Sequence, residues 1–164
     1  MNSEEVTIIS IAGKQNAGKT TLLKDLIPKL KEHGHRVGTL KYNIRKFDID
    51  HEGKDTYKYS NSGADSVAIS TQSEFVVMKK TANPLTLHEI TEAHFNDVNV
   101  VLVEGYREDD YPRVRIIGSQ DTNTVEADSE NLLLLVNEKT ENRCFSIENL
   151  DKALDFIEKH IITQ

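Results

Sequence analysis

The sequence has little of what secreted and membrane proteins depend on. It contains one cysteine, Cys144, so no disulfide can form within the chain, and no group of cysteines and histidines has the spacing of a zinc site. No stretch approaches the ~20 apolar residues that span a bilayer, and the acidic start with its short apolar run is unlike a signal peptide. These absences lead us to expect a soluble, cytoplasmic protein with no membrane partner.

Basic residues are outnumbered by acidic ones, 20 to 27, so the net charge is -7 at pH 7. Nucleic-acid binding depends on clustered Lys and Arg that neutralise phosphates. We therefore expect no nucleic-acid partner, and we expect any anion site to be local and built from backbone groups. The 164 residues include only three prolines and no low-complexity tract, which predicts a single globular domain over residues 1–164.

Short apolar runs alternate with helical patterns along the chain. The β-branched run at residues 6–12 is typical of a strand buried on both faces, and leucines on one stripe predict a helix over residues 20–33. Further strands are expected at 36–41, 66–70, 75–79, 99–103, 113–117 and 132–136, and further helices near Asp55, at 83–95 and at 147–161. The close spacing of the runs at 66–70 and 75–79 predicts a hairpin. The pattern as a whole predicts an α/β, doubly wound, mainly parallel sheet with that antiparallel hairpin.

A phosphate-binding motif lies between the first predicted strand and the first predicted helix. Residues 13–20, GKQNAGKT, match G-x-x-x-x-G-K-[ST] in full, and the strand–loop–helix context is the one that confirms a Walker A motif. The glycines let backbone N–H groups turn inward around an anion, and the N-terminus of the helix favours negative charge. The alternative, an ordinary glycine turn, is disfavoured by this context. The fold class is therefore P-loop NTPase-like.

Each residue of this loop has an expected role. Lys19 supplies charge to the β and γ phosphates, which makes it a candidate catalytic residue, and the Thr20 hydroxyl is expected to ligate Mg²⁺. Thr21 is expected to support the α phosphate. The other candidate nucleotide-binding residues of the loop are Gly13, Lys14, Asn16, Ala17 and Gly18.

A triphosphate site also needs a carboxylate to hold the metal, and in a doubly wound sheet such a group is expected at the carboxyl end of a strand. Glu104 follows the hydrophobic residues 100–103, so we expect it to reach the nucleotide crevice as a metal ligand and a candidate catalytic residue. The alternative is a strand-end glutamate that only meets solvent.

A charged loop supplies further candidates. Asp55 stands at the start of the short predicted helix and is a second candidate for the metal, through a bound water. Asp48 and Asp50 compete with it, and a solvated charge cluster is the alternative for all three. Lys54 is a candidate contact to a phosphate or a substrate, or else an exposed lysine.

The chain resembles the molybdopterin-guanine dinucleotide biosynthesis protein B family over nearly its whole length, in the order GKQNAGKTTLL, RVGTLKYNIRKFDIDHEGKDTYKYSNSGA and VVLVEGYRE. The segments FDIDHEGKDTY and VEGY are more specific than the P-loop, which many NTPases share. The resemblance implies a protein that binds GTP with Mg²⁺, hydrolyses it weakly and forms a homodimer. It also implies an adapter role in molybdenum cofactor biosynthesis, assisting the guanylyltransferase that joins GMP to molybdopterin.

The resemblance also implies roles for individual positions. Residues 13–21 would meet the phosphates, Thr20 and Glu104 the metal, and residues 50–55, including Asp50, the nucleotide or the pterin partner. One departure is that the family usually carries a histidine-rich stretch after the second strand's lysine, whereas here Lys41 is followed by YNIRK. Roles assigned to those histidines are therefore not carried over.

Guanine preference rests on the resemblance alone. Residues 137–140, NEKT, follow a predicted strand and partly match the asparagine-lysine-x-aspartate motif with which GTPases read the base. The aspartate that would bind the guanine N1 and N2 protons is lacking, so we do not count this segment as that motif.

Three functions stay open. The first is the GTP-binding adapter, at most a weak GTPase. The second is a small-molecule kinase or ligase that transfers the γ-phosphoryl group, for which neither a base nor an arginine-rich lid is evident. The third is a metallochaperone-type GTPase, which would want a Cys or His relay near the P-loop, whereas Cys144 is distant in the sequence.

Overall fold

The computed structural model describes residues 6–42, 44, 50–118, 130–137 and 145–161, and the chain divides into two compact units. The larger unit comprises Met1–Asn43 and Leu87–Gln164, and the smaller unit comprises Ile44–Thr86. This division does not test the expectation of one domain over residues 1–164, which stays a prediction. In the part of the chain that the structure describes, no helix is long and apolar enough to cross a membrane.

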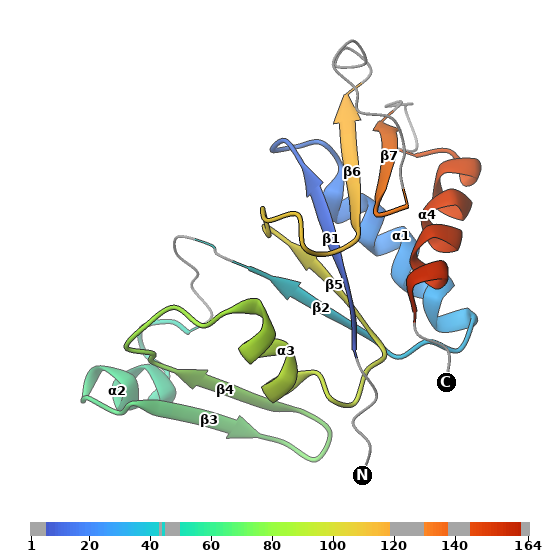
Figure 1. Ribbon diagram of the computed structural model, residues 1–164. Helices are drawn as coiled ribbons and strands as arrows, with labels where there is room; N and C mark the ends of the chain where they lie inside the picture. Colours follow the sequence, from blue (N-terminus) through green and yellow to red (C-terminus); the bar gives the residue numbers. More distant parts are fainter. Residues whose placement is uncertain (1–5, 43, 45–49, 119–129, 138–144, 162–164) are drawn as a thin grey trace. The chain divides into compact units, whose positions relative to one another are not determined.

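A five-stranded parallel sheet forms the centre of the larger unit (Figure 1). Its strands, in spatial order, are β2 (Val37–Lys41), β5 (Val100–Glu104), β1 (Thr7–Gly13), β6 (Arg113–Gly118) and β7 (Leu132–Asn137). β1 lies in the middle, with Ile9 opposite Leu102 of β5 and Ile11 opposite Val114 of β6. Because all the pairs are parallel, the carboxyl ends of the strands meet at one edge of the sheet.

Side chains alternate between the two faces of this sheet, and each face has its own core. On one face Ile9, Ile11 and Leu102 pack against α1 (Lys19–Glu32) and α4 (Ile147–His160). On the other face Ile8 and Val101 pack with residues that include Leu87 of α3 (Leu87–His94). Helices therefore cover both faces, which confirms the predicted α/β, doubly wound, P-loop NTPase-like sheet.

The smaller unit contains the predicted antiparallel hairpin, and this prediction is confirmed (Figure 1). β3 (Ser66–Ser70) pairs with β4 (Phe75–Lys79), and a short helix, α2 (Asp55–Asn61), precedes them. The turn is closed by Thr71, whose backbone N–H donates to the Glu74 carbonyl at 2.8 Å and whose hydroxyl accepts from the Glu74 N–H at 2.9 Å. Several apolar side chains of this hairpin are exposed: Ile69, Phe75, Val76 and Val77.

Most element boundaries lie within one residue of the sequence-based expectation, and the largest difference is at the start of α3. Helix α3 begins at Leu87 rather than near Asn83. The predicted roles of Asn83 as the cap and of Pro84 as a first-turn residue were therefore wrong. Leu87 is the first buried residue of this segment, at 3% exposure, and the helix begins where its side chains can pack. Strand β5 includes Glu104, which pairs with Ile11 and Lys41, so the carboxylate lies on the last residue of the strand and not after it.

Candidate functional site

The loop between β1 and α1 is shaped for an anion. β1 ends at Gly13 and α1 begins at Lys19, and the residue that precedes the helix, Gly18, has a left-handed φ of 100°. As a glycine, this N-cap residue has no side chain that could accept a hydrogen bond from the first amides of the helix. The first amides of a helix have no intrahelical acceptor, and they carry the positive end of the helix dipole. An anion at this position would accept hydrogen bonds from these amides and would be attracted by the positive end of the dipole.

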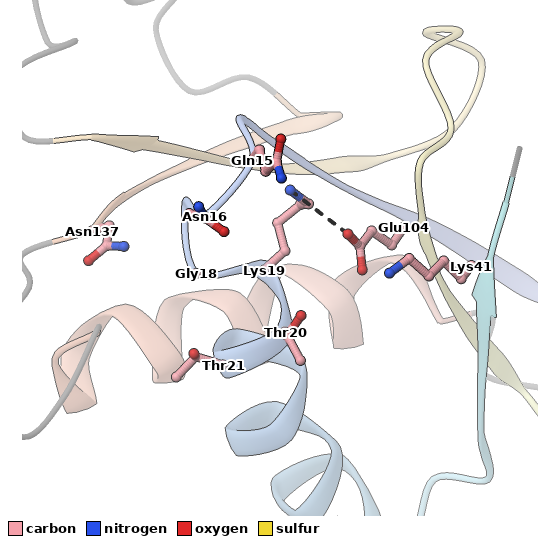
Figure 2. Close-up of a pocket in the computed structure, with 9 residues that line it drawn as sticks. All are labelled: Gln15, Asn16, Gly18, Lys19, Thr20, Thr21, Lys41, Glu104 and Asn137. Atoms are coloured by element: carbon pink, nitrogen blue, oxygen red, sulfur yellow. Dashed lines mark ion pairs between the residues drawn. The ribbon is translucent and has the colours of Figure 1, made fainter. Parts of the chain in front are cut away.

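The Lys19 ammonium lies over this loop. Its Nζ donates to the carbonyl oxygens of Gly13 at 3.0 Å and Lys14 at 2.9 Å, and it lies 3.8 Å from Oε1 of Glu104 (Figure 2). The exposed fractions of the Lys19 and Glu104 side chains are 15% and 20%. Because both groups are largely shielded, their charges act on each other and on any ligand more strongly than free surface charges do. A cation is thus held in place where the motif requires one.

Glu104 is positioned by the chain on both sides of it. Its carbonyl oxygen accepts from the Tyr42 N–H at 2.7 Å, which extends the pairing of β5 with β2 by one residue. Gly105, the next residue, has a φ of 96°, and a Cβ there would collide with the carbonyl oxygen of Tyr42. Only glycine fits this turn without displacing the backbone, so the turn fixes the direction in which the Glu104 side chain leaves the sheet.

A tyrosine cluster holds the segment that follows. The rings of Tyr42, Tyr106 and Tyr111 stack edge to face, with centroids 5.7 and 5.4 Å apart. The Tyr106 hydroxyl donates to Oδ2 of Asp110 at 2.9 Å, and burial, with help from this bond, raises the pKa of Tyr106. Burial also raises the pKa of Tyr111. Both hydroxyls are therefore neutral at physiological pH, and the cluster supports the Glu104 turn by packing.

A cleft of about 420 Å³ opens at the carboxyl edge of the sheet. Six predicted site residues line it: Asn16, Gly18, Lys19, Thr20, Thr21 and Glu104. Figure 2 shows the Thr20 hydroxyl on the same side of the loop as the Lys19 ammonium and the Glu104 carboxylate. Gly13, Lys14 and Ala17 belong to the same loop, and the first two supply the carbonyls that hold Lys19. The loop and the distant glutamate are thus brought together.

Gln15 of the predicted loop also lines the cleft, together with two residues that the sequence reasoning missed, Lys41 and Asn137. Lys41 ends β2 and Asn137 ends β7. The strand-end rule that selected Glu104 applies equally to these two positions. Lys41 ends a predicted strand and Asn137 follows one, so the rule makes both candidates, but which strand ends line the cleft depends on the order of the strands in the sheet.

The candidates in the charged loop belong to the smaller unit, so the structure leaves their predicted roles at the cleft as predictions. Asp50 accepts from the Thr56 hydroxyl at 3.1 Å through Oδ1, while its Oδ2 has no hydrogen-bond partner among the described residues. Asp55 pairs with Lys58 at 2.8 Å. Lys54 precedes α2.

Some of the positions named from the sequence lie outside the described residues: Asp48, Cys144 and residues 138–140. In the parts of the chain that are described, no three or more His, Cys, Asp or Glu side chains form a group that could hold a metal ion. The oxygen donors that line the cleft include the Thr20 hydroxyl and the Glu104 carboxylate, the two predicted metal ligands. These are hard oxygen ligands, which suit Mg²⁺ bound partly by phosphates and water.

Known proteins resemble this chain over most of its length. Residues 8–138 match the family described as molybdopterin guanine dinucleotide synthesis protein B, MobB. The molybdopterin-guanine dinucleotide biosynthesis adapter protein of Haemophilus influenzae is 25% identical over 160 residues, covering 95% of this chain and 90% of that protein. The adapter protein of the same name from Escherichia coli is 30% identical over 112 residues, covering 66% and 64%. The crystal structure of Bacillus subtilis MobB superposes with a TM-score of 0.69 at 24% identity, covering 96% of this chain and 99% of that one.

Proposed function

The chain belongs to the molybdopterin guanine dinucleotide synthesis protein B family, and from this premise we propose that it is a GTP-binding adapter in molybdenum cofactor biosynthesis. In this role it binds GTP with Mg²⁺ in the cleft of the larger unit, hydrolyses it slowly, and assists the guanylyltransferase that forms molybdopterin guanine dinucleotide. The relatives named as adapter proteins support a role in this biosynthetic pathway. The observation that carries nucleotide binding is the Lys19 ammonium held over an uncapped helix N-terminus.

The phosphates would occupy the cup that the loop forms. Lys19 has two carbonyl acceptors and one carboxylate nearby, so its ammonium keeps its position before any ligand arrives. A ligand that meets a preorganised cation avoids the entropic cost of ordering it. Lys41 adds a second positive charge at the rim, and Figure 2 shows its side chain directed toward Glu104.

Magnesium would be held by Thr20 and Glu104, with phosphate oxygens and water completing its shell. When bound, the ion would neutralise charge on the phosphates. Thr20 stands in the first turn of α1 and Glu104 ends β5, and both line one cleft, which supports this assignment. Asp55 is the further candidate, acting through a water, and Lys54 and Asp50 are proposed to face the nucleotide or the pterin partner.

Slow hydrolysis fits the side chains of the cleft. Fast phosphoryl transfer uses a residue that positions the nucleophile and a cation, often arginine, that stabilises the transition state. The described lining residues include neither arginine nor histidine. An efficient kinase or ligase would therefore need such groups from elsewhere. Rapid phosphorylation of an added acceptor would overturn the adapter proposal, and slow release of phosphate without an acceptor would support it.

A second copy of the chain is the proposed partner of the hairpin. In β3 and β4, Ile69 and Val76 share one face while Phe75 and Val77 lie on the other, and all four are exposed. A surface hairpin usually keeps one polar face, whereas apolar groups exposed on both faces mark an interaction surface. In a homodimer these side chains would be covered.

The homodimer can be tested at one position. Phe75→Glu should produce a monomer in light scattering, because a charge would replace the most exposed large side chain of the hairpin. Gln72→Glu, which adds the same charge in the turn, is the control and should leave the dimer intact. A wild-type protein that stays monomeric at all concentrations would refute the proposal.

Nucleotide and partner binding can be tested together. Calorimetry should show that GTP binds with Mg²⁺ more tightly than ATP does, and a preference for ATP would contradict the guanine assignment. The GTP-loaded protein should retain the guanylyltransferase on an affinity column. The Lys19→Ala variant serves as the matched control, because it should lose the nucleotide while keeping the fold. Equal retention by both proteins would show that the partner does not read the nucleotide.

A further inference from the structure

We infer that Asn137 is a positioning residue for phosphate binding. Its side-chain amide orients the peptide between Ala17 and Gly18 so that the Gly18 N–H faces the bound phosphates. This inference rests on the proposed nucleotide site and deepens it. It gives a role to a residue that lies 120 positions from the loop in the sequence.

The contact is direct. Asn137 is the last residue of β7 and is 7% exposed. Its Nδ2 donates to the carbonyl oxygen of Ala17 at 2.7 Å. Figure 2 shows Asn137 on one side of the phosphate loop and the Lys19 and Glu104 side chains on the other. The loop is therefore held from behind by a strand end that contributes nothing to the motif itself.

Peptide geometry turns this bond into an orientation. The peptide unit is planar and trans, so the carbonyl of one residue and the N–H of the next point in opposite directions. The described chain contains no cis peptide bonds. With the Ala17 oxygen bound to Asn137, the Gly18 N–H must point away from Asn137, toward the side of the loop where Lys19 lies. In a P-loop the inward amides are the groups that bind the phosphate oxygens.

The packing behind Gly18 shows how closely the strand end approaches. A Cβ at Gly18 would stand 3.0 Å from Asn137 Nδ2 and 3.2 Å from the ring of Phe145. Phe145 is 2% exposed and belongs to the main core. The back of the loop is thus pressed against Asn137 and a rigid ring, which leaves little room for the 17–18 peptide to rotate.

The loop needs such an anchor, because its neighbouring residues alternate in backbone handedness. Asn16 has a φ of 60° and Gly18 a φ of 100°, both in the left-handed region. Alternation of this kind turns successive N–H groups inward, where their dipoles repel one another until an anion binds. A hydrogen bond from a buried side chain can hold this arrangement in advance, and a preorganised site binds more tightly than one that must rearrange.

The test replaces Asn137 by leucine, which has a similar size but cannot donate. The probe is GDP with Mg²⁺, measured by calorimetry. We expect about tenfold weaker binding, the loss that corresponds to one hydrogen bond of ordinary strength. In wild type the Gly18 amide proton resonance should move downfield when GDP binds, and in Asn137→Leu this shift should be much smaller.

Asn149→Leu is the matched control. In wild type, Nδ2 of Asn149 also donates to a main-chain carbonyl oxygen, that of Val136, at 3.3 Å. That carbonyl is not part of the phosphate loop. This variant should lower the melting temperature without changing the GDP affinity or the Gly18 shift. If Asn137→Leu binds GDP as wild type does, with the same Gly18 shift, the inference is wrong while the nucleotide site stands. If wild type itself fails to bind, the proposed function fails first.

A second variant covers the case in which Asn137→Leu does not fold. Asn137→Asp keeps the shape but places an acceptor against the Ala17 carbonyl, and Asn149→Asp controls for the added charge. Asn137→Asp should weaken GDP binding more than Asn149→Asp does, and equal losses would overturn the inference. Failure of both Asn137 variants to fold would also overturn it, because the residue would then serve the fold rather than the loop.

Discussion

The larger unit buries its strands on both faces, whereas the smaller unit leaves a row of apolar side chains in contact with solvent. In β1 and β5, Ile9 and Leu102 are fully buried between two layers. In β3 and β4, Ile69 is 44% and Phe75 69% exposed, and α2 has no buried residue. A two-stranded hairpin alone is marginally stable in water. The contrast teaches that the candidate nucleotide site stands on strands buried on both faces, whereas the hairpin exposes the apolar side chains that the proposed second copy would cover.

The sharpest test of this contrast removes the charge at the centre of the site. Lys19→Ala should weaken GTP binding by more than about a hundredfold, because a preorganised charge-assisted contact is lost from a shielded position. The circular dichroism spectrum should not change, since the Lys19 side chain is not part of the core. Lys24→Ala, at an exposed position of the same helix, is the control. If calorimetry finds the same GTP affinity for Lys19→Ala as for wild type, the loop at residues 13–20 is not the phosphate-binding site.

The next effect concerns the metal. Glu104→Gln keeps the size of the side chain but removes the charge, so GTP binding with Mg²⁺ should weaken about tenfold, with little change in EDTA. The measurement is a pair of titrations, with and without the ion. Because Glu104 also lies 3.8 Å from Lys19, an equal change in both titrations would mean that the carboxylate acts on the lysine rather than on the metal.

The same substitution in the two sheets compares their cores directly. Ile9→Val removes one buried methylene and should cost about 1 kcal/mol of unfolding free energy. Ile69→Val on the exposed hairpin should cost less than about 0.5 kcal/mol in dilute protein. Urea unfolding checks both values. If the free energy of unfolding lost in Ile69→Val grows with protein concentration, the result would support a homodimer that covers the hairpin. If Ile69→Val and Ile9→Val lose equal amounts in dilute protein, the two sheets do not differ as described.

The smallest effect lies at the far side of the larger unit, where Glu158 of α4 accepts from His33 and His35 at 2.9 Å each. Burial acts to raise the pKa of Glu158, but the two histidines outweigh it, so the pKa is lowered. The ionised carboxylate therefore stabilises the fold above the ordinary glutamate pKa of about 4.3, and this contribution is lost as the pH falls through the lowered pKa.

Glu158→Gln measures that contribution. At neutral pH the free energy of unfolding of the variant should be lower than that of wild type by less than about 1 kcal/mol, because the pair is partly exposed. The variant should therefore have the lower melting temperature. The difference should shrink as the pH falls below about 4.3. A difference in melting temperature that stays constant down to pH 2 would assign the effect to packing rather than to charge.

Much of this architecture could be predicted because its signals are local. The hairpin strands at 66–70 and 75–79 were placed at their observed bounds, since β-branched runs around a short polar turn specify both strands and pairing. The start of α3 was wrong, because Asn83 and Pro84 suit a helix start locally while burial begins only at Leu87. Lys41 and Asn137 were missed as site residues, because which strand ends meet at the cleft depends on the spatial order of the strands.

The sequence by itself determined the chemistry of the phosphate loop, because eight contiguous residues between a buried strand and a helix contain the glycines, the lysine and the threonine that the cup requires. Tertiary structure alone decided what surrounds that cup. Glu104 comes within reach of Lys19, and Asn137 reaches Ala17, only because parallel strands far apart in the chain end at the same edge of one sheet. No local pattern encodes such a meeting, since it follows from the packing of the whole unit.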